Sequence, residues 1–500
     1  MHERIVVPDI ADYSKHALDA AFAIELDDGS RLDVLMPVRR VPGKRLVCRG
    51  ELHGREVYAK FFIGKSAEKY AARDCRGSQW LSDAGIATPP LLLQSRVEAQ
   101  SCHVLVYAAI DGRNAEEVWQ SLAGQEQARF VLAAKLVEEV GRHHAAGIWQ
   151  SDLYLKNFLV QGARVHTLDG DGIRRLRPLF RRRQAWDNLA LLLSKFDVYS
   201  LADWLPLLLD RYGQVFGGNE LPGLEPMQRL IARHRAEEMR RYADKVLRTC
   251  TDVVVEQDSS FFLAINRPYD NASLRAALQI VDTLLDAPDA IRLKSGNTCT
   301  VAEIEIDQRK MVIKRYNIKS FWHGLGRALR PSRAVVSWSN AYRLGICGLA
   351  TPVAIAVLER RRWLLRKQAY LVTEFVSAPD SLTFFDDQAI EGAQKQQAAQ
   401  GIARLFYSLF LLNVEHGDFK ASNVLVQGVT PLLIDLDSMR QYRCSVRFRP
   451  RHIRDIRRFM KNWQSDAEVR HLLIEAFRAV YRDTDLLDQA GLVIKQSERQ

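Results

Sequence analysis

HGDFKASNVLVQGVTPLLIDLD, residues 416–437, contains the side chains that decide how the rest of the chain is interpreted. Asp418 is followed five residues later by Asn423, and twelve residues after that by Asp435. Phosphoryl transfer from a metal-bound nucleotide uses such a set, since one carboxylate takes the proton of the acceptor hydroxyl while an amide and a second carboxylate hold Mg²⁺. The apolar run between Asn423 and Asp435 predicts a short β-hairpin that brings both ends of the stretch together.

The same spacing occurs a second time in QSDLYLKNFLVQGARVHTLDGD, residues 150–171. Asp152, Asn157 and Asp169 each stand 266 residues before their counterparts, and Asn-Phe-Leu-Val-Gln-Gly matches Asn-Val-Leu-Val-Gln-Gly. Two copies at one offset, in the same hydrophobic context, indicate a tandem duplication. A repeated Gly-hydrophobic-Ala-Thr-Pro sequence, at 85–89 and 348–352, supports this interpretation.

The composition is that of a globular protein with several domains. A chain of 500 residues is too long for one core, and 47% hydrophobic with 26% charged residues is ordinary. The seven cysteines contain no Cys-x-x-Cys pair, which favours reduced thiols in the cytosol over disulfides or zinc. The N-terminus does not resemble a secretory signal, and no apolar run of about eighteen residues predicts a membrane span.

Two lysines stand at the ends of predicted strands, one in each half of the chain. Lys60 follows Val-Tyr-Ala, and Lys314 follows Met-Val-Ile. A lysine on an inner strand that faces a cleft can bridge nucleotide phosphates, whereas a surface lysine is the plain alternative. No Gly-x-Gly-x-x-Gly precedes Lys60. Glu374 ends a further predicted strand, and the backbone of the connection that follows would face an adenine.

A predicted helix follows each of these lysines. The helix at 67–84 offers Asp74 or Glu68 as a carboxylate partner for Lys60, and the sequence does not distinguish the two. The helix at 332–344 offers none, and Ser337 stands where the carboxylate is expected.

No acid occurs from Arg315 to Leu358. The positive side chains of that segment are Arg315, Lys319, Arg327, Arg330, Arg333 and Arg343. Lys314 therefore either pairs elsewhere or belongs to a unit with impaired catalysis.

The net charge of +11 favours contact with polyanions such as nucleic acid, an acidic membrane face or a phosphorylated glycolipid. Six arginines lie in residues 174–183, and residues 440–463 hold nine Lys and Arg with one acid. Residues 451–463 predict a basic amphipathic helix that would suit a membrane surface. A solvated charge run and an ordinary helix of the C-lobe are the alternatives.

The order of the motifs resembles the protein-kinase-like superfamily in both halves. Within it, GIWQSDLYLKNFLV and VEHGDFKASNVLV are similar to the bacterial lipopolysaccharide core kinases, which phosphorylate heptose or Kdo sugars. The resemblance implies an α+β fold of two tandem bilobal domains, each with a mainly β N-lobe and a mainly α C-lobe. The predicted domains are residues 1–249 and 250–500.

The resemblance also implies roles for the site residues, with ATP and Mg²⁺ as cofactors. Asp152 and Asp418 would be catalytic bases, and Lys420 would contact the transferred phosphoryl group. Lys60, Asp74, Lys314 and Glu374 would bind the nucleotide. The implied metal ligands are Asn157, Asp169, Asn423 and Asp435.

The two copies depart from the kinase pattern at different points. Gln150 stands where the second copy has His416, and Tyr154 replaces Lys420, with Lys156 as the nearest cation. Neither metal-binding aspartate is followed by Phe-Gly. These departures cast doubt on regulation in the manner of protein kinases more than on the chemistry.

The leading hypothesis is an ATP-dependent kinase of sugar hydroxyls in the lipopolysaccharide inner core. It would act in the cytoplasm, at the inner-membrane face, on an anionic glycolipid, without a transmembrane segment. The alternatives are a protein Ser/Thr kinase and a scaffold in which one or both units are pseudokinases. A nucleic-acid partner is not expected, because no recognition motif accompanies the arginines.

Overall fold

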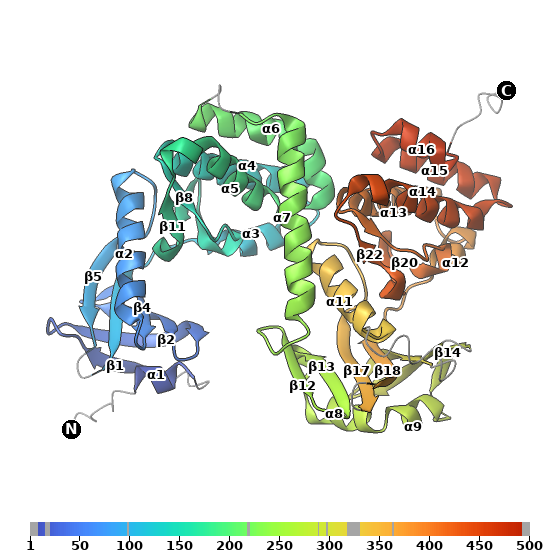
Figure 1. Ribbon diagram of the computed structural model, residues 1–500, viewed down its shortest axis with the longest axis horizontal. Coiled ribbons are helices and arrows are strands. Elements are labelled where there is room, and N and C mark those ends of the chain that lie inside the picture. The colour runs from blue at the N-terminus through green and yellow to red at the C-terminus, as the bar shows by residue number, and fades with distance from the viewer. Residues whose placement is uncertain are drawn as a thin grey trace. The chain divides into compact units, whose positions relative to one another are not determined.

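The computed structural model describes residues 9–15, 21–97, 100–217, 221–288, 290–296, 299–317, 331–362 and 365–492 (Figure 1). Lys319, Arg327 and Arg330 of the acid-free segment lie outside these ranges. The chain divides into two compact units, residues 1–196 with 200–231, and residues 197–199 with 232–500. The domain limits 1–249 and 250–500 remain a prediction.

The first unit begins with a short helix, α1 (Ile10–Tyr13), and an antiparallel sheet of six strands in the order β1-β2-β3-β4-β6-β5. The strands are β1 (Phe22–Glu25), β2 (Arg31–Val41), β3 (Arg45–Leu52), β4 (Arg55–Ile63), β5 (Leu91–Arg96) and β6 (Cys102–Ala108). Alternation along β4 buries Val57, Ala59 and Phe61 on one face and turns Lys60 to the other. Helix α2 (Ala67–Asp83) packs against β4 and β6 on the side that Lys60 faces.

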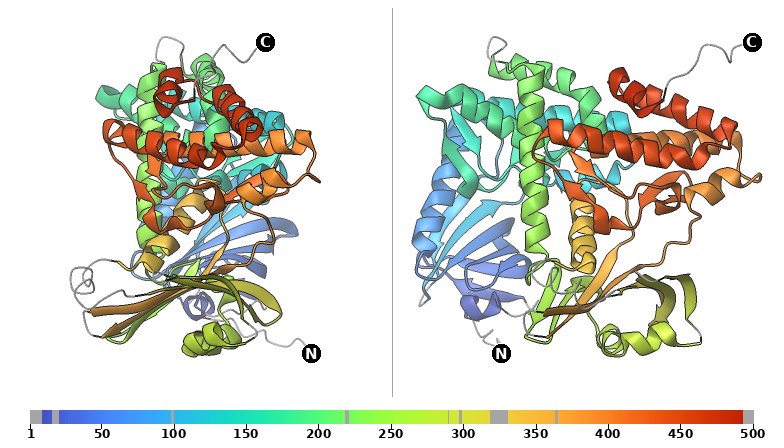
Figure 2. Two further views of the ribbon diagram at one scale, coloured as in Figure 1. Left: turned by 90° about the vertical axis from the view of Figure 1, so that its right-hand side faces the viewer. Right: turned by 45° about the vertical axis from the view of Figure 1, so that its right-hand side comes forward.

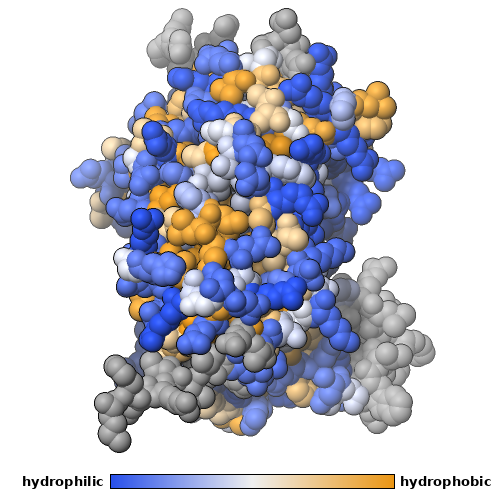
Figure 3. Space-filling model, turned by 90° about the vertical axis from the view of Figure 1, so that its left-hand side faces the viewer, coloured by the Kyte–Doolittle hydropathy of each residue, from blue (hydrophilic) through white to orange (hydrophobic). Residues whose placement is uncertain are grey.

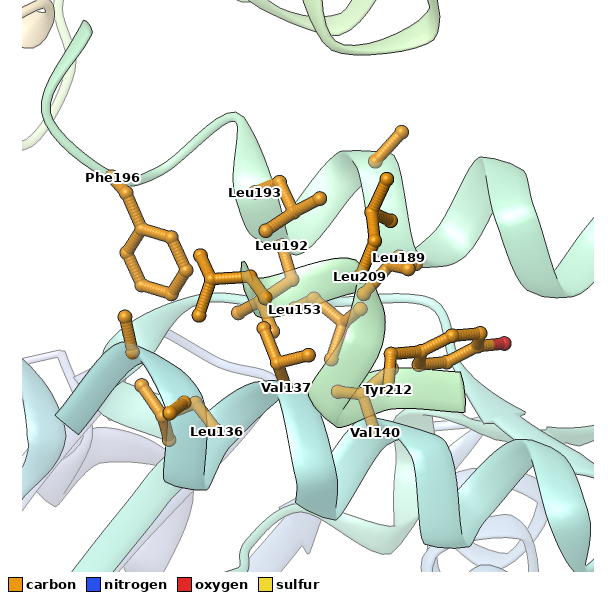
Figure 4. Packing of buried hydrophobic residues seen from close by; sticks show 14 of the residues in the cluster. Leu136, Val137, Val140, Leu153, Leu189, Leu192, Leu193, Phe196, Leu209 and Tyr212 are labelled. Carbon is orange, nitrogen blue, oxygen red and sulfur yellow. The ribbon is translucent and has the colours of Figure 1, made fainter. Parts of the chain in front are cut away.

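Helices form the rest of the first unit. They are α3 (Ala115–Ser121), α4 (Glu126–Ala145), α5 (Arg181–Leu193), α6 (Val198–Phe216) and α7 (Leu224–Lys245), of which α7 crosses the division between the units. Short strands connect them: β7 (Arg113–Asn114), β8 (Ile148–Gln150), β9 (Phe158–Gln161), β10 (Arg164–Thr167) and β11 (Ile173–Arg175). Figure 4 shows Val137, Val140, Leu192 and Tyr212 of this core gathered around Leu153. Burial of Leu153 therefore anchors the loop that carries Asp152.

The second unit repeats the sheet with a different extension. Its seven strands follow the order β12-β13-β17-β18-β16-β15-β14. They are β12 (Val253–Gln257), β13 (Phe261–Asn266), β14 (Ile291–Ser295), β15 (Cys299–Ile306), β16 (Arg309–Tyr316), β17 (Ala354–Arg362) and β18 (Leu365–Glu374). The order β2-β3-β4-β6-β5 of the first unit thus matches β14-β15-β16-β18-β17 of the second, which places Lys60 and Lys314 on equivalent strands.

Among the described residues, the helices that accompany this sheet are α8 (Ala272–Gln279), α9 (Val281–Asp286) and α11 (Arg333–Ile346). Helix α11 contacts β17 and β18, as α2 contacts β6 in the first unit. It starts at Ser332, whose hydroxyl accepts a hydrogen bond from the Val335 N–H and so caps the first turn.

The helical lobe of the second unit lies on one side of its sheet, as both views of Figure 2 show. It contains α12 (Ser381–Asp386), α13 (Gly392–Leu411), α14 (Ser445–Met460), α15 (Ala467–Val480) and α16 (Thr484–Ala490), with short strands β19 (Val414–Glu415), β20 (Val424–Gln427), β21 (Thr430–Leu433) and β22 (Arg440–Gln441). Phe419 is fully buried and stacks on Phe406 of α13, with ring centroids 3.8 Å apart. It anchors the Asp418 loop as Leu153 anchors the loop of Asp152.

Each unit therefore has a sheet lobe followed by a helical lobe, which confirms the predicted α+β class. The repeated Thr-Pro sequences have one structural role in both copies. Thr88 Oγ1 donates to the Thr167 carbonyl at 2.9 Å, and Thr351 Oγ1 donates to the Leu433 carbonyl at 2.8 Å. These bonds tie the sheet lobe of each unit to the hairpin of its helical lobe.

Figure 3 shows one face of the molecule, on which hydrophilic side chains dominate and apolar ones form smaller patches. Among the helices that the structure describes, none combines the length and the hydropathy needed to span a bilayer.

Candidate functional site

The Asp418 loop and the hairpin after it have the predicted form. Strand β20 pairs with β21 in the register Val424 with Leu433. The Asn423 amide nitrogen donates to the Asp418 carbonyl at 2.9 Å, and the Ile434 N–H donates to the Asn423 carbonyl at 3.0 Å. These two bonds bring Asp418, Asn423 and Asp435 to one edge of the lobe, although 17 residues separate the two aspartates.

The first unit repeats these contacts. The Asn157 amide nitrogen donates to the Asp152 carbonyl at 2.7 Å, and the Leu168 N–H donates to the Asn157 carbonyl at 2.8 Å. Asp169 and Asp435 also share a left-handed backbone, with φ of 68° and 62°. Residues other than glycine adopt this conformation rarely, and strained positions cluster at functional sites.

Lys60 lies between a buried carboxylate and a partly buried one in the first unit. Its Nζ lies 3.1 Å from Asp74 Oδ2 and 3.3 Å from Asp169 Oδ1. The Tyr107 hydroxyl donates to Asp74. Glu68, the other carboxylate left open by the sequence, is exposed and lies near Arg96. Asp74 is therefore the partner of Lys60.

Charge outweighs burial at Lys60 and Asp169, whereas burial outweighs charge at Asp74. Burial lowers the pKa of Lys60, but the carboxylates of Asp74 and Asp169 raise it by more, so the ammonium stays charged. Burial also raises the pKa of Asp74, against the opposing charge of Lys60. The pKa of Asp169 is held low because Lys60 and Arg45 outweigh its burial.

Lys314 is held without any carboxylate from helix α11. Its Nζ lies 2.5 Å from Asp435 Oδ1 and 3.6 Å from Asp437 Oδ2. Ser337 takes the place of Asp74 and shares a hydrogen bond of 3.0 Å with the Tyr316 hydroxyl. Lys314 therefore pairs elsewhere, which was one of the two outcomes that the sequence left open.

An aromatic ring lies under the lysine in both units, but it comes from a different strand in each. Lys60 Nζ is 5.1 Å from the ring centre of Tyr107 on β6, and Lys314 Nζ is 4.9 Å from that of Tyr316 on β16. These tyrosines could not be found by comparing the two repeats, because they occupy different places in them.

A third carboxylate, two residues after the predicted metal ligand, was also missed as a site residue. Asp171 pairs with Arg45, at 2.8 Å, and with Arg73. Asp437 pairs with Arg333 of α11 at 2.7 Å. Burial and the neighbouring Asp435 charge raise the pKa of Asp437, while Lys314 outweighs burial and lowers that of Asp435. The available signal was the aspartate that both repeats keep at this position.

A cavity of about 800 Å³ opens between the sheet and the helical lobe of the second unit. Lys314, Asn423, Asp435 and Lys420 line it together with residues 374–379, which include Glu374. Its apolar wall is formed by Val301, Val312, Leu371 and Leu425. This combination of apolar walls and one polar end is typical of a small-molecule site.

The donor set of Asn423 and Asp435 suits Mg²⁺. Because the Asn423 amide nitrogen is bonded to the Asp418 carbonyl, its oxygen remains available as a ligand. Among the described residues no group of three His, Cys, Asp or Glu could hold a metal alone. Two protein oxygens, completed by nucleotide phosphates and water, match the way proteins usually bind Mg²⁺.

His416 and Gln150 make the same contact despite their different chemistry. His416 Nε2 lies 3.1 Å from the Ile434 carbonyl and must carry the proton, and Gln150 Nε2 donates to the Leu168 carbonyl at 2.8 Å. The departure at Gln150 therefore preserves the link between the loop and the hairpin.

The base of the second loop rests on Asp455 of helix α14. Its carboxylate accepts from the His416 N–H at 2.8 Å and from the Gly417 N–H at 3.2 Å. Burial raises the pKa of Asp455 to about 6, against these two backbone bonds. In the first unit Asn188 occupies the corresponding place and donates to the Gln150 carbonyl at 2.7 Å.

The surroundings of the two predicted bases differ. Asp418 lies 3.8 Å from Lys420 and forms an ion pair with Arg458. Near Asp152, the Tyr154 ring lies 5.3 Å from Lys156 Nζ and 4.8 Å from Lys195 Nζ. Lys195 and Arg458 were not predicted as neighbours of these loops, because both lie far from them along the chain.

The basic tract at 174–183 is partly used for packing. Arg174 donates to the Asp171 carbonyl at 2.7 Å, Arg175 lies over the Trp80 ring, and Arg181 over the Phe216 ring. Leu179 and Phe180, between these arginines, are exposed.

Comparison with known proteins gives one family. Residues 291–477 match the lipopolysaccharide kinase (Kdo/WaaP) family. None of the curated proteins matches the chain. Among solved structures, the BubR1 kinase domain is similar at 12% identity and a TM-score of 0.26, over 35% of this chain and 53% of that one. Over residues 291–477, the second unit is thus similar to the lipopolysaccharide kinases of the Kdo/WaaP family, which confirms the resemblance inferred from its residues.

Proposed function

We propose that the second unit is an ATP-dependent kinase that phosphorylates a sugar hydroxyl of the lipopolysaccharide inner core. One observation carries the proposal: a single cavity is lined by Lys314, Asn423, Asp435 and Lys420 together with residues 374–379. This cavity lies within the segment that matches the Kdo/WaaP family. A protein Ser/Thr kinase would use the same phosphate-binding residues, so the acceptor distinguishes the two functions.

The nucleotide would lie with its base against the apolar wall and its phosphates toward Lys314. Asn423 and Asp435 would hold Mg²⁺, which when bound would neutralise phosphate charge. Asp418 would take the proton of the attacking hydroxyl, and Lys420 would stabilise charge on the transferred group. Catalysis of this kind depends on positioning and electrostatics.

The proposal includes the acceptor and the cellular location of the reaction. An anionic glycolipid at the cytoplasmic face of the inner membrane is consistent with the net charge of +11. Peripheral contact with that membrane would need no spanning helix.

The first unit is the second candidate site. It keeps Lys60 paired with Asp74, and it keeps the contacts among Asp152, Asn157 and Asp169. We propose that it binds the nucleotide with Mg²⁺. A measurement of turnover by the first unit would decide whether Asp152 acts as a base there or the unit is a pseudokinase.

The test compares Asp418→Asn, Asp152→Asn and the double variant in the full chain. Each is assayed with labelled ATP, Mg²⁺ and lipopolysaccharide core glycolipid, and core phosphate is measured by mass spectrometry. Removal of a general base lowers turnover by about 10²–10⁴-fold, and we expect this for Asp418→Asn. Exposed Asp386→Asn and Asp111→Asn are the matched controls.

Transfer of label to casein rather than to glycolipid would favour the protein kinase. Unchanged core phosphate in the double variant would refute the sugar-kinase proposal. A loss with Asp152→Asn alone would move catalysis to the first unit.

A further inference from the structure

Helix α14 presents a line of four arginines on one face. Arg447, Arg451, Arg454 and Arg458 are spaced four, three and four residues apart, so they share one side of the helix over about three turns. All four are exposed, whereas Phe448, His452, Ile456 and Phe459 are buried on the opposite side. We call these four residues the arginine stripe.

The stripe ends at the predicted base. Arg458 forms an ion pair with Asp418, and Arg454 forms one with the buried Glu415. Arg447 and Arg451 make no ion pair with any described residue. The outer half of the stripe therefore carries uncompensated positive charge, and its inner half reaches the carboxylate that would accept the proton.

The ion pair with Arg458 has a chemical consequence. A guanidinium bound to Asp418 occupies the carboxylate lone pairs that an acceptor hydroxyl would use. Guanidinium groups also bind phosphate and carboxylate in the same forked geometry. An acidic group on the acceptor could therefore replace Asp418 as the partner of Arg458 and leave the base open.

We propose that the arginine stripe binds acidic groups of the sugar acceptor, and that Arg458 exchanges Asp418 for one of them. The acceptor class is thus an oligosaccharide with phosphate or carboxylate groups beside the hydroxyl that is phosphorylated. This inference rests on the proposed function. It adds which residues recognise the acidic groups of that acceptor and how the predicted base is released.

The first unit has no arginine at the position that corresponds to Arg458. Asn188 of α5 corresponds to Asp455, since both hold the backbone of their loop. Three residues later, Leu191 stands where the second unit has Arg458. Acceptor selection by this route therefore belongs to the second unit alone.

The test uses the double variant Arg447→Gln/Arg451→Gln in the full chain, because neither residue touches the cavity or Asp418. The acceptors are lipid-free core oligosaccharide and the same material after removal of its phosphates with hydrofluoric acid. Loss of two arginine–phosphate contacts should raise KM for the phosphorylated acceptor about tenfold, with little change in kcat. The KM for the dephosphorylated acceptor should change less.

Arg248→Gln/Lys367→Gln removes the same charge from exposed positions of the second unit and is the matched control. Equal KM values for the stripe variant and this control would overturn the inference. Arg458→Gln should lower the preference for the phosphorylated acceptor, and an unchanged preference would also contradict it.

Binding separates this inference from the proposed function. The phosphorylated oligosaccharide is titrated calorimetrically into the Asp418→Asn protein with and without the stripe variant, which requires no turnover. Weaker binding by the stripe variant supports the inference even if no phosphate is transferred. If phosphatidylglycerol vesicles bind in a stripe-dependent way and the oligosaccharide does not, the anion is a lipid headgroup and the inference fails.

Discussion

The two lysines that are predicted to bind phosphate, Lys60 and Lys314, are held by different means in the two units. In the first, Asp74 on helix α2 bonds Lys60, and Tyr107 from the neighbouring strand β6 supports that carboxylate. In the second, helix α11 has Ser337 in place of a carboxylate, and Lys314 bonds Asp435 and Asp437 from the helical lobe. The position of a buried lysine can thus be maintained while the carboxylates around it change, provided that its charge stays compensated.

Removing each lysine in turn tests which of the two clefts contributes to phosphoryl transfer. Lys314→Met should lower phosphoryl transfer by about 10²–10³-fold, the usual effect of losing one group that stabilises transition-state charge. Lys60→Met should change it little if the second unit alone turns over. Initial rates with labelled ATP and core glycolipid measure both, with circular dichroism as the check on folding. Equal losses would mean that both clefts contribute.

The second test breaks the carboxylate contact of the first unit. Asp74→Ala leaves Lys60 buried with only Asp169 as a partner, and losing one member of a buried pair costs about 3–5 kcal/mol of unfolding free energy. Exposed Glu68→Ala is the control, with an expected effect within about 0.5 kcal/mol. Denaturant unfolding of the full chain measures both. An effect of Asp74→Ala as small as the control would show that Asp169 alone suffices.

The third test concerns Asp455, whose counterpart in the first unit is the uncharged Asn188. In the folded state the pKa of the Asp455 carboxyl is about 6, above its ordinary value of 3.8. The folded state therefore retains a proton that the unfolded chain releases. The contribution of this carboxyl to stability is therefore largest below about pH 4 and is lost as the pH rises to about 6. The loss is on the order of 3 kcal/mol.

Asp455→Asn should remove this decline. The measurement is the free energy of unfolding of wild type and variant between pH 4 and 7. Parallel curves over that range would contradict the assignment. Gln464→Ala, which changes an exposed uncharged side chain of the same unit, is the control and should leave the pH dependence unchanged.

The smallest expected effect concerns Ser337, the residue that stands in place of Asp74. Ser337→Ala removes one hydrogen bond to Tyr316 and should cost about 1 kcal/mol. Tyr316→Phe removes the same bond, so the double variant should lose less than the sum of the two. Strict additivity in this cycle would show that the hydroxyl groups do not interact.

The sequence predicted the parts of each site that lie close together along the chain. Asp418, Asn423 and Asp435 were found because a hairpin joins them, and local patterns also gave the strands of Lys60 and Lys314.

Contacts between distant segments were harder to predict. Asp455 and Arg458 lie about 40 residues after the loop that they touch, and their place depends on how α14 packs. The signal available for Asp455 was that it is the one acid in a tract with nine basic residues.

The contacts of helix α11 determine how the second unit would respond if this helix were displaced. Arg333 bonds Asp437, and the Asn340 amide nitrogen donates to the Leu436 carbonyl at 2.8 Å, so the helix is tied to the segment after Asp435. In the first unit, displacement of α2 would separate Asp74 from Lys60. Displacement of the corresponding helix would therefore disturb the predicted nucleotide lysine in the first unit and the segment after the predicted metal ligand Asp435 in the second.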